Sequence, residues 1–396
     1  MSEPEERKLP ELPHDAIVDI LSRLPCKSLL KFRCVSKQWN SIIRSHKFTK
    51  LQLSKSIGDT SRQRVLLRLK PSFCSINYED LDDFVEGHFE VISREDAPPL
   101  LADVDFFLYD SYVVGQCHGL FCIMMSKREE TSFLLWNPTT RECKEVKKND
   151  VANMVDAGCM FDIKKIRWNP CEGYGFGYDS SSDDYKIVRL SGPQTNVVVV
   201  EIYKIGSRIW KKLEQSISDT IYIFQSILSH NICPFLNGAC HWVALKSSNE
   251  DSLILRFDLR KEVVEEVALP QYLSKSEFLY EVIVFDGKLA LPNKVNDVEM
   301  EFWVMDEYGV GSSFTKKVTM HAAPGSRLSN FTIAICLPKN GGVLMFNDGC
   351  RDRLPMISPE TKIRKKATYI WEPHFLAVYA ESLISPYHIP NANDNL

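Results

Sequence analysis

Two Cys-His pairs are the residues of this sequence whose types and spacing could form a catalytic site. Cys117 directly precedes His118, and Cys240 directly precedes His241. A thiol beside an imidazole can act as a nucleophile that a base activates. However, no third polar group is fixed beside either pair, and the two pairs occupy about the same place in two similar stretches of sequence. We therefore predict that they are structural residues of a repeated unit and that the protein is not an enzyme.

A glycine-rich segment and two neighbouring aspartates are the next candidates. Gly173, Gly175 and Gly177 have a G-x-G-x-G spacing, but no helical pattern follows them. A phosphate-binding loop needs the amides of such a helix, so we predict a strand with aromatic neighbours instead. Asp183 and Asp184 lie in a serine-rich turn and are expected to be solvated, with a weak cation site as the alternative.

The 12 cysteines give no metal or redox motif. They are scattered, no C-x-x-C occurs, and no ligand pair has the spacing of a zinc site. We expect mostly buried free thiols, as in a reducing compartment, and neither a metal ion nor another cofactor. Four tryptophans recur with the repeated unit and are expected in its core: Trp136, Trp210, Trp242 and Trp303.

The elements that would position these residues begin with a helical stretch from residue 9 to residue 50. Its periodicity predicts three short helices. Pro13 suits the first position of the first helix, Pro25 would end that helix, and Ser36 suits the N-cap of the third. In chain order, the apolar positions of the three helices are Ile17, Ile20, Leu21 and Leu24, then Leu29, Leu30 and Phe32, then Val35, Trp39, Ile42 and Ile43.

These helices carry more large apolar side chains than so small a module can bury. Roughly 40 residues enclose only a very small core. Each large apolar side chain left in water forfeits about 1.5–3 kcal/mol. We therefore expect either that another protein covers the outer surface or that the helices cap the rest of this chain, and periodicity alone leaves both readings open.

A local excess of positive charge accompanies the helices. Residues 23–55 contain nine Lys and Arg and no Asp or Glu, whereas the whole chain has a formal net charge of −4. Such an excess steers an acidic partner. A basic three-helix unit could also be a helix-turn-helix, but Leu24-Pro25 would break its tight turn, and its last helix is apolar where base-reading side chains are needed. We expect no binding to nucleic acid.

The order and spacing of several motifs in this stretch resemble an F-box of the plant type. The motifs are Leu12-Pro13, Leu24-Pro25 with Lys27-Ser28-Leu29, and Arg33-Cys34-Val35-Ser36-Lys37 with Trp39. The resemblance implies that the helices bind a Skp-type adaptor, which bridges to a cullin in a ubiquitin ligase. The adaptor-binding residues that it implies, some of which must form the module's own core, are Leu12, Pro13, Ile17, Leu24, Pro25, Leu29, Leu30, Val35 and Trp39.

After residue 55, short strand-like runs alternate with turn residues. A unit of several strands recurs at Gly119, Gly238 and Gly287, with a weaker copy at Gly342 and a further copy between the first two. Periods near 50 residues are typical of propeller blades with four strands each. The region has room for about six blades, and a C-terminal strand such as Phe375–Tyr379 could close the first blade. A β-sandwich with long insertions is the alternative.

This second region also has a family resemblance, from about residue 100 to residue 385. It is similar to the plant F-box-associated region, the kelch-like half of S-locus F-box and F-box/kelch-type proteins. The motifs that carry the similarity are Gly115–Leu120, Leu135–Arg141, Tyr174–Asp179, Asp183–Val188, Asn237-Gly238 with His241-Trp242, and Trp303–Met305 with Glu307–Val310.

The expected fold is an α+β multidomain chain, with a three-helix F-box before an all-β propeller. The predicted parts are a disordered start at 1–8, the F-box at 9–50, a linker at 51–64, the propeller at 65–385 and a disordered tail at 386–396. No signal peptide or membrane-spanning run is apparent, so a cytoplasmic or nuclear protein, or one found in both, is expected.

The resemblances imply the substrate-recognition subunit of a Skp–cullin–F-box ubiquitin ligase. In such a complex the propeller would bind a target protein for ubiquitination and proteasomal degradation. Neither the target nor the residues that bind it can be identified, although the long segments 151–162 and 216–234 are candidates. The alternative is a propeller enzyme or carbohydrate-binding protein with an N-terminal helical cap.

Overall fold

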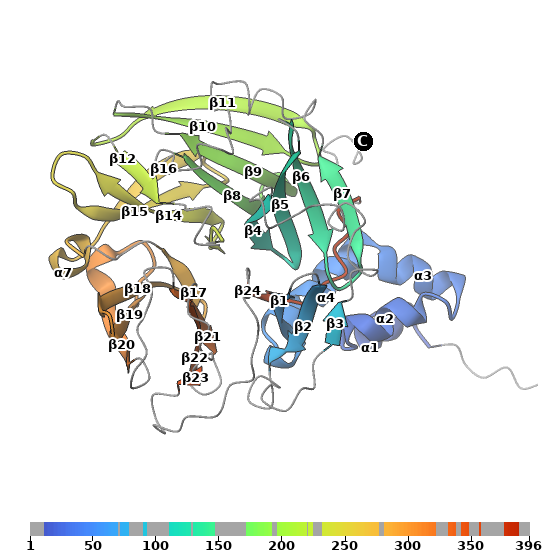
Figure 1. The fold of residues 1–396 in the computed structure, drawn as a ribbon. Helices are drawn as coiled ribbons and strands as arrows, with labels where there is room; N and C mark the ends of the chain where they lie inside the picture. Colours follow the sequence, from blue (N-terminus) through green and yellow to red (C-terminus); the bar gives the residue numbers. More distant parts are fainter. Residues whose placement is uncertain are drawn as a thin grey trace, which may run out of the picture.

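The structure is a computed structural model. It describes residues 12–69, 72–78, 90–92, 111–127, 130–146, 172–191, 196–219, 221–224, 232–276, 281–321, 332–337, 342–347, 356–357 and 376–387. Four helices precede a set of antiparallel sheets that are arranged as a propeller (Figure 1). The predicted order, a small helical module followed by an all-β propeller, is confirmed. The expected disordered start at 1–8 lies outside the described residues. Of the tail expected to be disordered at 386–396, residues 386 and 387 form a turn, and residues 388–396 lie outside the described residues.

The helices are α1 (His14–Ser22), α2 (Cys26–Phe32), α3 (Lys37–Arg44) and α4 (His46–Ile57). Pro13 takes the N-cap of α1, one residue before its expected place, and Pro25 takes the N-cap of α2. The side chain of Ser36 caps α3, since its Oγ accepts a hydrogen bond from the Trp39 amide at 3.1 Å. We refer to residues 12–57 as the helical module.

The fourth helix changes the picture of the expected linker. Residues 51–64 were expected to be a linker, but α4 continues to Ile57, η1 (Thr60–Arg62) follows, and β1 begins at Gln63. Ser45 ends α3 and caps α4 with its side chain. The periodicity of α4 is hard to recognise because the helix packs against α1 and α3 and also lies against β24. Leu53 of α4 is accordingly buried in a core cluster of the propeller.

The strands form six sheets, with the orders β24-β1-β2-β3, β4 to β7, β8 to β11, β12-β14-β15-β16 with β13 on β14, β17 to β20, and β21 to β23. In chain order they are β1 Gln63–Leu69, β2 Ser72–Asn77, β3 Glu90–Ile92, β4 Ser111–Cys117, β5 Leu120–Lys127, β6 Glu130–Asn137, β7 Glu142–Val146, β8 Glu172–Asp179, β9 Asp184–Ser191, β10 Val197–Lys204, β11 Ile209–Ser216, β12 Ile221–Phe224, β13 Phe235–Leu236, β14 Ala239–Lys246, β15 Ser252–Asp258, β16 Val263–Ala268, β17 Ile283–Phe285, β18 Lys288–Asn296, β19 Glu299–Met305, β20 Phe314–His321, β21 Thr332–Leu337, β22 Gly342–Asn347, β23 Met356–Ile357 and β24 Leu376–Ala380. A short helix, α7 (Gln271–Ser274), follows β16, and η7 (Gly311–Ser313) precedes β20.

We refer to these sheets as the first to sixth blades. Five of them have at least four strands, and the sixth has three among the described residues. The described residues therefore form five full blades, where about six were expected, and one sheet of three strands.

The first blade combines both ends of the propeller sequence. β24 pairs antiparallel with β1, with Val378 opposite Val65. Arg64 on β1 also forms an ion pair with Glu381, just after β24, at 2.9 Å. The predicted closure of the first blade by a C-terminal strand is confirmed, and this pairing covers an edge of β1 that would otherwise be exposed.

Two-residue turns explain the recurring glycines. Gly119, Gly238 and Gly287 have φ values of 77°, 77° and 71°, and the residue before each also has a positive φ. Turns with positive φ at both central residues suit the twist of antiparallel hairpins and favour glycine. At Gly119 a side chain would also collide with its surroundings, since a Cβ would lie 2.7 Å from the carbonyl oxygen of Ala380.

Neighbouring blades pack closely along their inner strands. The G-x-G-x-G segment lies in β8, as predicted, and a Cβ on Gly175 would lie only 2.8 Å from the ring of Trp242 in the fourth blade. The indole nitrogen of Trp242 donates to the carbonyl oxygen of Tyr174 at 3.1 Å. Of the four tryptophans expected in the core, Trp136 and Trp242 are buried, and Trp210 and Trp303 are partly buried against core clusters.

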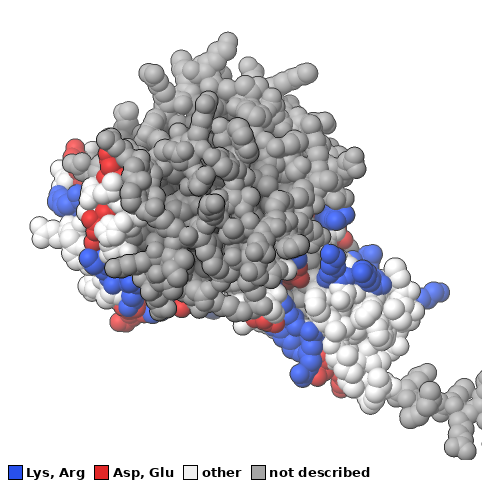
Figure 2. Space-filling view, turned by 60° about the horizontal axis from the view of Figure 1, so that its bottom comes forward, with Lys and Arg blue, Asp and Glu red and all other residues white. Residues whose placement is uncertain are grey.

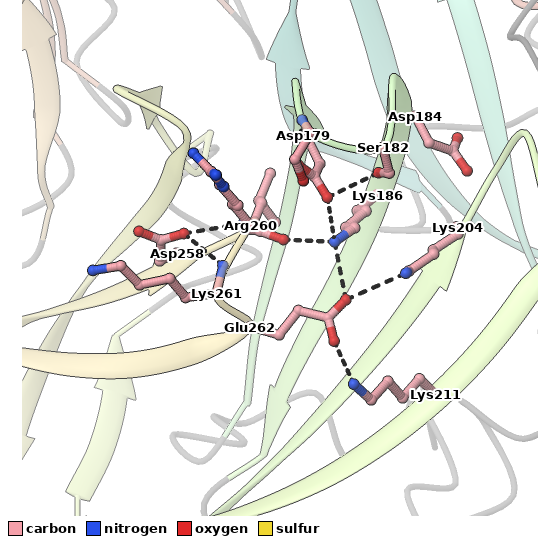
Figure 3. Close-up of polar contacts among 12 residues, drawn as sticks. Asp179, Ser182, Asp184, Lys186, Lys204, Lys211, Asp258, Arg260, Lys261 and Glu262 are labelled. Carbon is pink, nitrogen blue, oxygen red and sulfur yellow. Dashed lines mark hydrogen bonds and ion pairs between the residues drawn. The ribbon is translucent and has the colours of Figure 1, made fainter. Parts of the chain in front are cut away.

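A buried ion network joins the third and fourth blades (Figure 3). Lys186 on β9 is 1% exposed, and its Nζ lies 2.8 Å from Asp179 Oδ2 and 3.0 Å from Glu262 Oε1. Lys204 and Lys211 approach Glu262 from the outer strands. Burial would raise the pKa of Glu262, but hydrogen bonds from Lys211 and Lys186 outweigh it and lower the pKa. The network therefore holds charged groups that would be costly to bury alone.

Candidate functional site

The helical module has its own core, completed by one residue from the other end of the chain. Leu21, Leu29 and Ile43 are at most 1% exposed, and Leu383, which follows β24, packs among them. Leu29 is therefore one of the expected residues that form the module's own core, since a side chain fully buried between helices is not available to a partner.

The other expected adaptor-binding residues remain at least partly accessible on the module. Leu12 and Val35 are both 60% exposed, and Pro13 and Pro25 are also exposed. Four others are half-buried at the edge of the core: Ile17, Leu24, Leu30 and Trp39.

Trp39 and Ile20 also contribute to this surface. Trp39 is held in place by Phe32, whose ring packs edge-to-face on it with centroids 5.6 Å apart. Ile20 is 51% exposed and was not in the expected set. The spacing of α1 placed Ile20 on the same face as Leu21, but the helix is turned so that Leu21 enters the core and Ile20 faces outward.

We refer to the exposed and half-buried residues named above as the outer apolar surface. They are Leu12, Pro13, Ile17, Ile20, Leu24, Pro25, Leu30, Val35 and Trp39.

Positive charge surrounds this surface. Figure 2 shows the helical module at the lower right, where an uncharged area lies beside groups of Lys and Arg. Asp15 and Asp19 are the only acidic residues in the module. Hydrogen bonds from Arg23 and Lys55 lower the pKa of Asp19, which keeps this carboxyl ionised and paired. The module is therefore suited to an acidic, partly apolar partner.

The opposite side of the module is fixed to the propeller by residues 381–387, which we name the C-terminal segment. Leu383 lies in the module's core, and the next residue, Ile384, lies in a core cluster of the propeller. Asn137, at the end of β6, is fully buried and donates from Nδ2 to the carbonyl oxygens of Ser382 and Ile384 at 3.1 and 2.8 Å. One short segment thus packs into both parts of the molecule.

A second attachment uses Asp183, in the turn between β8 and β9. Its carboxylate lies 2.8 Å from Lys50 Nζ and 2.9 Å from His46 Nε2, both on α4, and it accepts a hydrogen bond from Tyr178. Burial would raise the pKa of Asp183, but hydrogen bonds from Lys50, Tyr178 and His46 lower it.

The expectation that both aspartates are solvated is therefore wrong for Asp184 and only partly met by Asp183, whose side chain is 37% exposed. Asp183 binds the helical module, and Asp184 is 3% exposed. Asp184 accepts hydrogen bonds from the amides of Gly206 and Ser207 at 2.7 and 3.1 Å. Both carboxylates already have protein partners.

The sequence left two possibilities for the helices: a cap on the rest of the chain, or a surface that another protein covers. Each of them describes one side of the module. One side caps the propeller, while the outer apolar surface has no cover from the described residues of this chain.

The two Cys-His pairs join blades. His118 Nδ1 lies 3.1 Å from the hydroxyl of Tyr185 in the third blade, and His241 Nε2 lies 2.9 Å from the hydroxyl of Tyr308 in the fifth. Burial lowers the pKa of each imidazole to about 4, and burial raises the pKa of the Cys117 thiol. A protonated thiol and a neutral imidazole that holds a neighbouring blade are suited to packing and not to nucleophilic attack.

The described ranges lack the features of two other classes of site. Within those ranges, no three His, Cys, Asp or Glu side chains come together in a way that could hold a metal ion. No described helix is long and apolar enough to cross a bilayer.

Comparison with known proteins divides the chain into the same two parts, a helical domain and a propeller domain. Residues 9–51 match the model of the F-box domain, and residues 65–386 match that of the F-box associated beta propeller domain. The chain is similar to the F-box/kelch-repeat protein At3g23880 of Arabidopsis thaliana, with 26% identity over 367 residues, which cover 86% of this chain and 93% of that protein. It is also similar to the F-box protein CPR1 of Arabidopsis thaliana, with 26% identity over 330 residues, which cover 78% of this chain and 73% of that protein.

Proposed function

This chain belongs to the F-box proteins that carry an F-box associated β-propeller domain, and from that premise we propose that it is the substrate-recognition subunit of a Skp–cullin–F-box ubiquitin ligase. The helical module would bind a Skp-type adaptor and, through it, a cullin. The propeller would bind a target protein for ubiquitination and degradation. Such a protein would act in the cytoplasm, the nucleus or both.

The outer apolar surface is the observation that carries this proposal. Leu12, Ile20 and Val35 are each at least 51% exposed, although burying such a side chain is worth about 1.5–3 kcal/mol. Clustered apolar side chains beside positive charge favour the binding of an acidic protein at this surface. In an adaptor complex this surface would be covered.

The chain would act by positioning and not by bond chemistry. Holding a target near an activated ubiquitin converts a bimolecular encounter into a local one, provided that the geometry is fixed. The C-terminal segment and the contact of Asp183 with α4 fix the helical module to the propeller, so a bound target would be presented in a defined orientation relative to the adaptor.

The strand order suggests which end of the propeller is free for the target. The helical module contacts the turn that joins the first and second strands of the third blade. In an antiparallel blade, the connection between the second and third strands lies at the other end. In the fifth blade that connection exposes Val295 and Val298, which are 44% and 48% exposed. We infer that targets bind at this other end.

Affinity capture with the proteasome inhibited tests the proposal. The intact protein should retain both a Skp-type adaptor and a ubiquitinated target. A variant with Leu12→Asp and Val35→Asp should lose the adaptor and keep the target, whereas one with Val295→Asp and Val298→Asp should lose the target and keep the adaptor. Val263→Asp, at a 37% exposed valine on β16, is the matched control. Retention of the adaptor by the first variant would contradict the proposal.

A further inference from the structure

A cavity of about 350 Å³ lies where the helical module meets the propeller. Arg33, Arg44 and Lys50 line it from the module, and Glu142 and Tyr178 line it from the second and third blades. Its volume is at the lower end of the range for small-molecule sites. The cavity does not overlap the outer apolar surface proposed to bind the adaptor, since it shares none of its residues.

Two polar atoms of the cavity-lining residues lack partners. Arg33 Nε and Glu142 Oε2 are both buried, and neither has a hydrogen-bond partner among the described residues. Buried polar groups are nearly always satisfied, and leaving one unsatisfied costs about 1–3 kcal/mol. One unpaired donor and one unpaired acceptor belong to residues that line the same cavity, and a bound molecule that offers both an acceptor and a donor would satisfy them once the two side chains turn toward it.

The charges around the cavity favour an anion. Lys50 and His46 are already bound to Asp183, which leaves Arg33 and Arg44 facing a single carboxylate, Glu142. Burial and the charge of Arg44 lower the pKa of Arg33, while Glu142 opposes this shift. An anionic group between the two arginines would relieve their repulsion, and guanidinium groups suit carboxylate and phosphate oxygens.

The rest of the lining favours an organic body. Tyr178 and Tyr185 present aromatic rings, and Leu53, Leu383 and Ile384 add aliphatic surface. Water alone could pair with polar groups of the lining, but the apolar surface of the cavity would then remain in contact with water. An aromatic or aliphatic group would bury it.

We propose that this cavity binds a small organic anion whose carboxylate or phosphate lies at Arg33 and Arg44, whose hydroxyl or amine donates to Glu142, and whose apolar body packs on the two tyrosines. Because the cavity is walled by both the helical module and the propeller, such a ligand would bind the assembled arrangement of the two and would stabilise it.

Three related probes test the proposal on the full-length chain by calorimetry. Phenyllactate carries a ring, a carboxylate and a hydroxyl; phenylpropanoate lacks the hydroxyl, and phenylpropanol lacks the carboxylate. We expect phenyllactate to bind with a Kd below about 1 mM. Phenylpropanol should bind at least about tenfold more weakly, because it offers nothing to the arginines. Phenyl phosphate, which carries a phosphate in place of the carboxylate, is a fourth probe. Equal binding of phenyllactate and phenylpropanol, or no binding of either phenyllactate or phenyl phosphate below about 1 mM, would overturn the proposal.

Two substitutions locate the binding site. Glu142→Gln should lower the ratio of phenyllactate affinity to phenylpropanoate affinity severalfold, because only phenyllactate donates a hydroxyl to this residue, whereas the loss of the negative charge acts on both acids. Arg33→Gln should weaken both acids by about tenfold or more. Arg260→Gln, at an exposed arginine remote from the cavity, is the control. Unchanged affinity in both cavity variants would place binding elsewhere and overturn the assignment, whether or not the protein binds an adaptor.

Discussion

Asn137 donates a hydrogen bond from Nδ2 to the carbonyl oxygen of Ile384 at 2.8 Å, across a sequence separation of 247 residues. This contact ties the second blade to the C-terminal segment, which also places Leu383 in the core of the helical module. The part of the chain that would recognise an adaptor and the part that would hold a target are therefore connected through a buried, hydrogen-bonded segment.

Asn137→Asp tests this connection. The aspartate keeps the oxygen that accepts a hydrogen bond from the Thr139 amide but replaces the donor that faces the carbonyl oxygens of Ser382 and Ile384. Unpaired buried polar groups cost about 1–3 kcal/mol each, so we expect the free energy of unfolding to fall by roughly 3 kcal/mol or more. Denaturant titration measures this change, and limited proteolysis should show the helical module released first. Asn237→Asp, at an exposed asparagine in a two-residue turn, is the control and should have little effect.

Ser36→Ala tests the start of α3. The hydroxyl of Ser36 accepts the Trp39 amide hydrogen bond that caps this helix. Removing an N-cap typically costs about 0.5–2 kcal/mol of stability, and Ser36→Gly should cost only a few tenths of a kcal/mol. Ser41→Ala, at an exposed site inside the same helix, should be neutral or slightly stabilising because alanine favours helix interiors. Equal unfolding midpoints for Ser36→Ala and Ser41→Ala would show that the cap does not stabilise the helix.

The two blade-joining histidines predict how stability depends on pH. Burial lowers the pKa of His118 and of His241 from 6.5 to about 4. The unfolded chain therefore binds more protons than the folded chain between these values. Stability should be complete above about pH 6.5 and should fall as the pH decreases toward about 4.

Substituting these histidines should reduce the slope of stability against pH in that interval. His118→Asn is suitable because asparagine tolerates the φ of 55° at this position, and His241→Gln keeps hydrogen-bonding capacity. Unfolding titrations at several pH values provide the measurement. An unchanged slope between about pH 4 and 6.5 in the double variant would show that other groups cause the pH dependence.

Lys186→Met tests the ion network between the third and fourth blades. The methionine keeps most of the aliphatic length but leaves Asp179 and Glu262 without their buried cation. Removing one partner of a buried pair typically costs about 3–5 kcal/mol. Lys211→Met removes a neighbour of Glu262 that is 45% exposed, and exposed pairs contribute less than about 1 kcal/mol. Similar losses of thermal stability in the two variants would contradict the central role of Lys186.

Local sequence patterns predicted much of the architecture. The repeat could be recognised from Gly119, Gly238 and Gly287, which occupy the second position of three two-residue turns. Only a few residue types adopt a positive φ at that position. The N-cap at Ser36 and the closure of the first blade by a C-terminal strand also follow from short patterns, and both are present in the structure.

The errors concern contacts between residues that are distant in sequence. Spacing alone could not show that Leu29 faces the core while Ile20 faces outward, since both lie on apolar faces of short helices. Nor could it show that Asp183 meets Lys50, 133 residues earlier, or that α4 would pack on the propeller and leave no linker. Partners of this kind are set by how the domains dock, which one sequence does not reveal.

The central claim is that the outer apolar surface of the helical module binds a Skp-type adaptor, and the affinity of the full-length chain for a purified adaptor tests it most directly. We predict measurable binding by the unmodified protein and by Val263→Asp. A variant with Leu12→Asp and Val35→Asp should lose at least about 2 kcal/mol of binding free energy, which is roughly a thirtyfold rise in Kd, with its fold intact by circular dichroism. The same affinity in all three proteins would contradict the account.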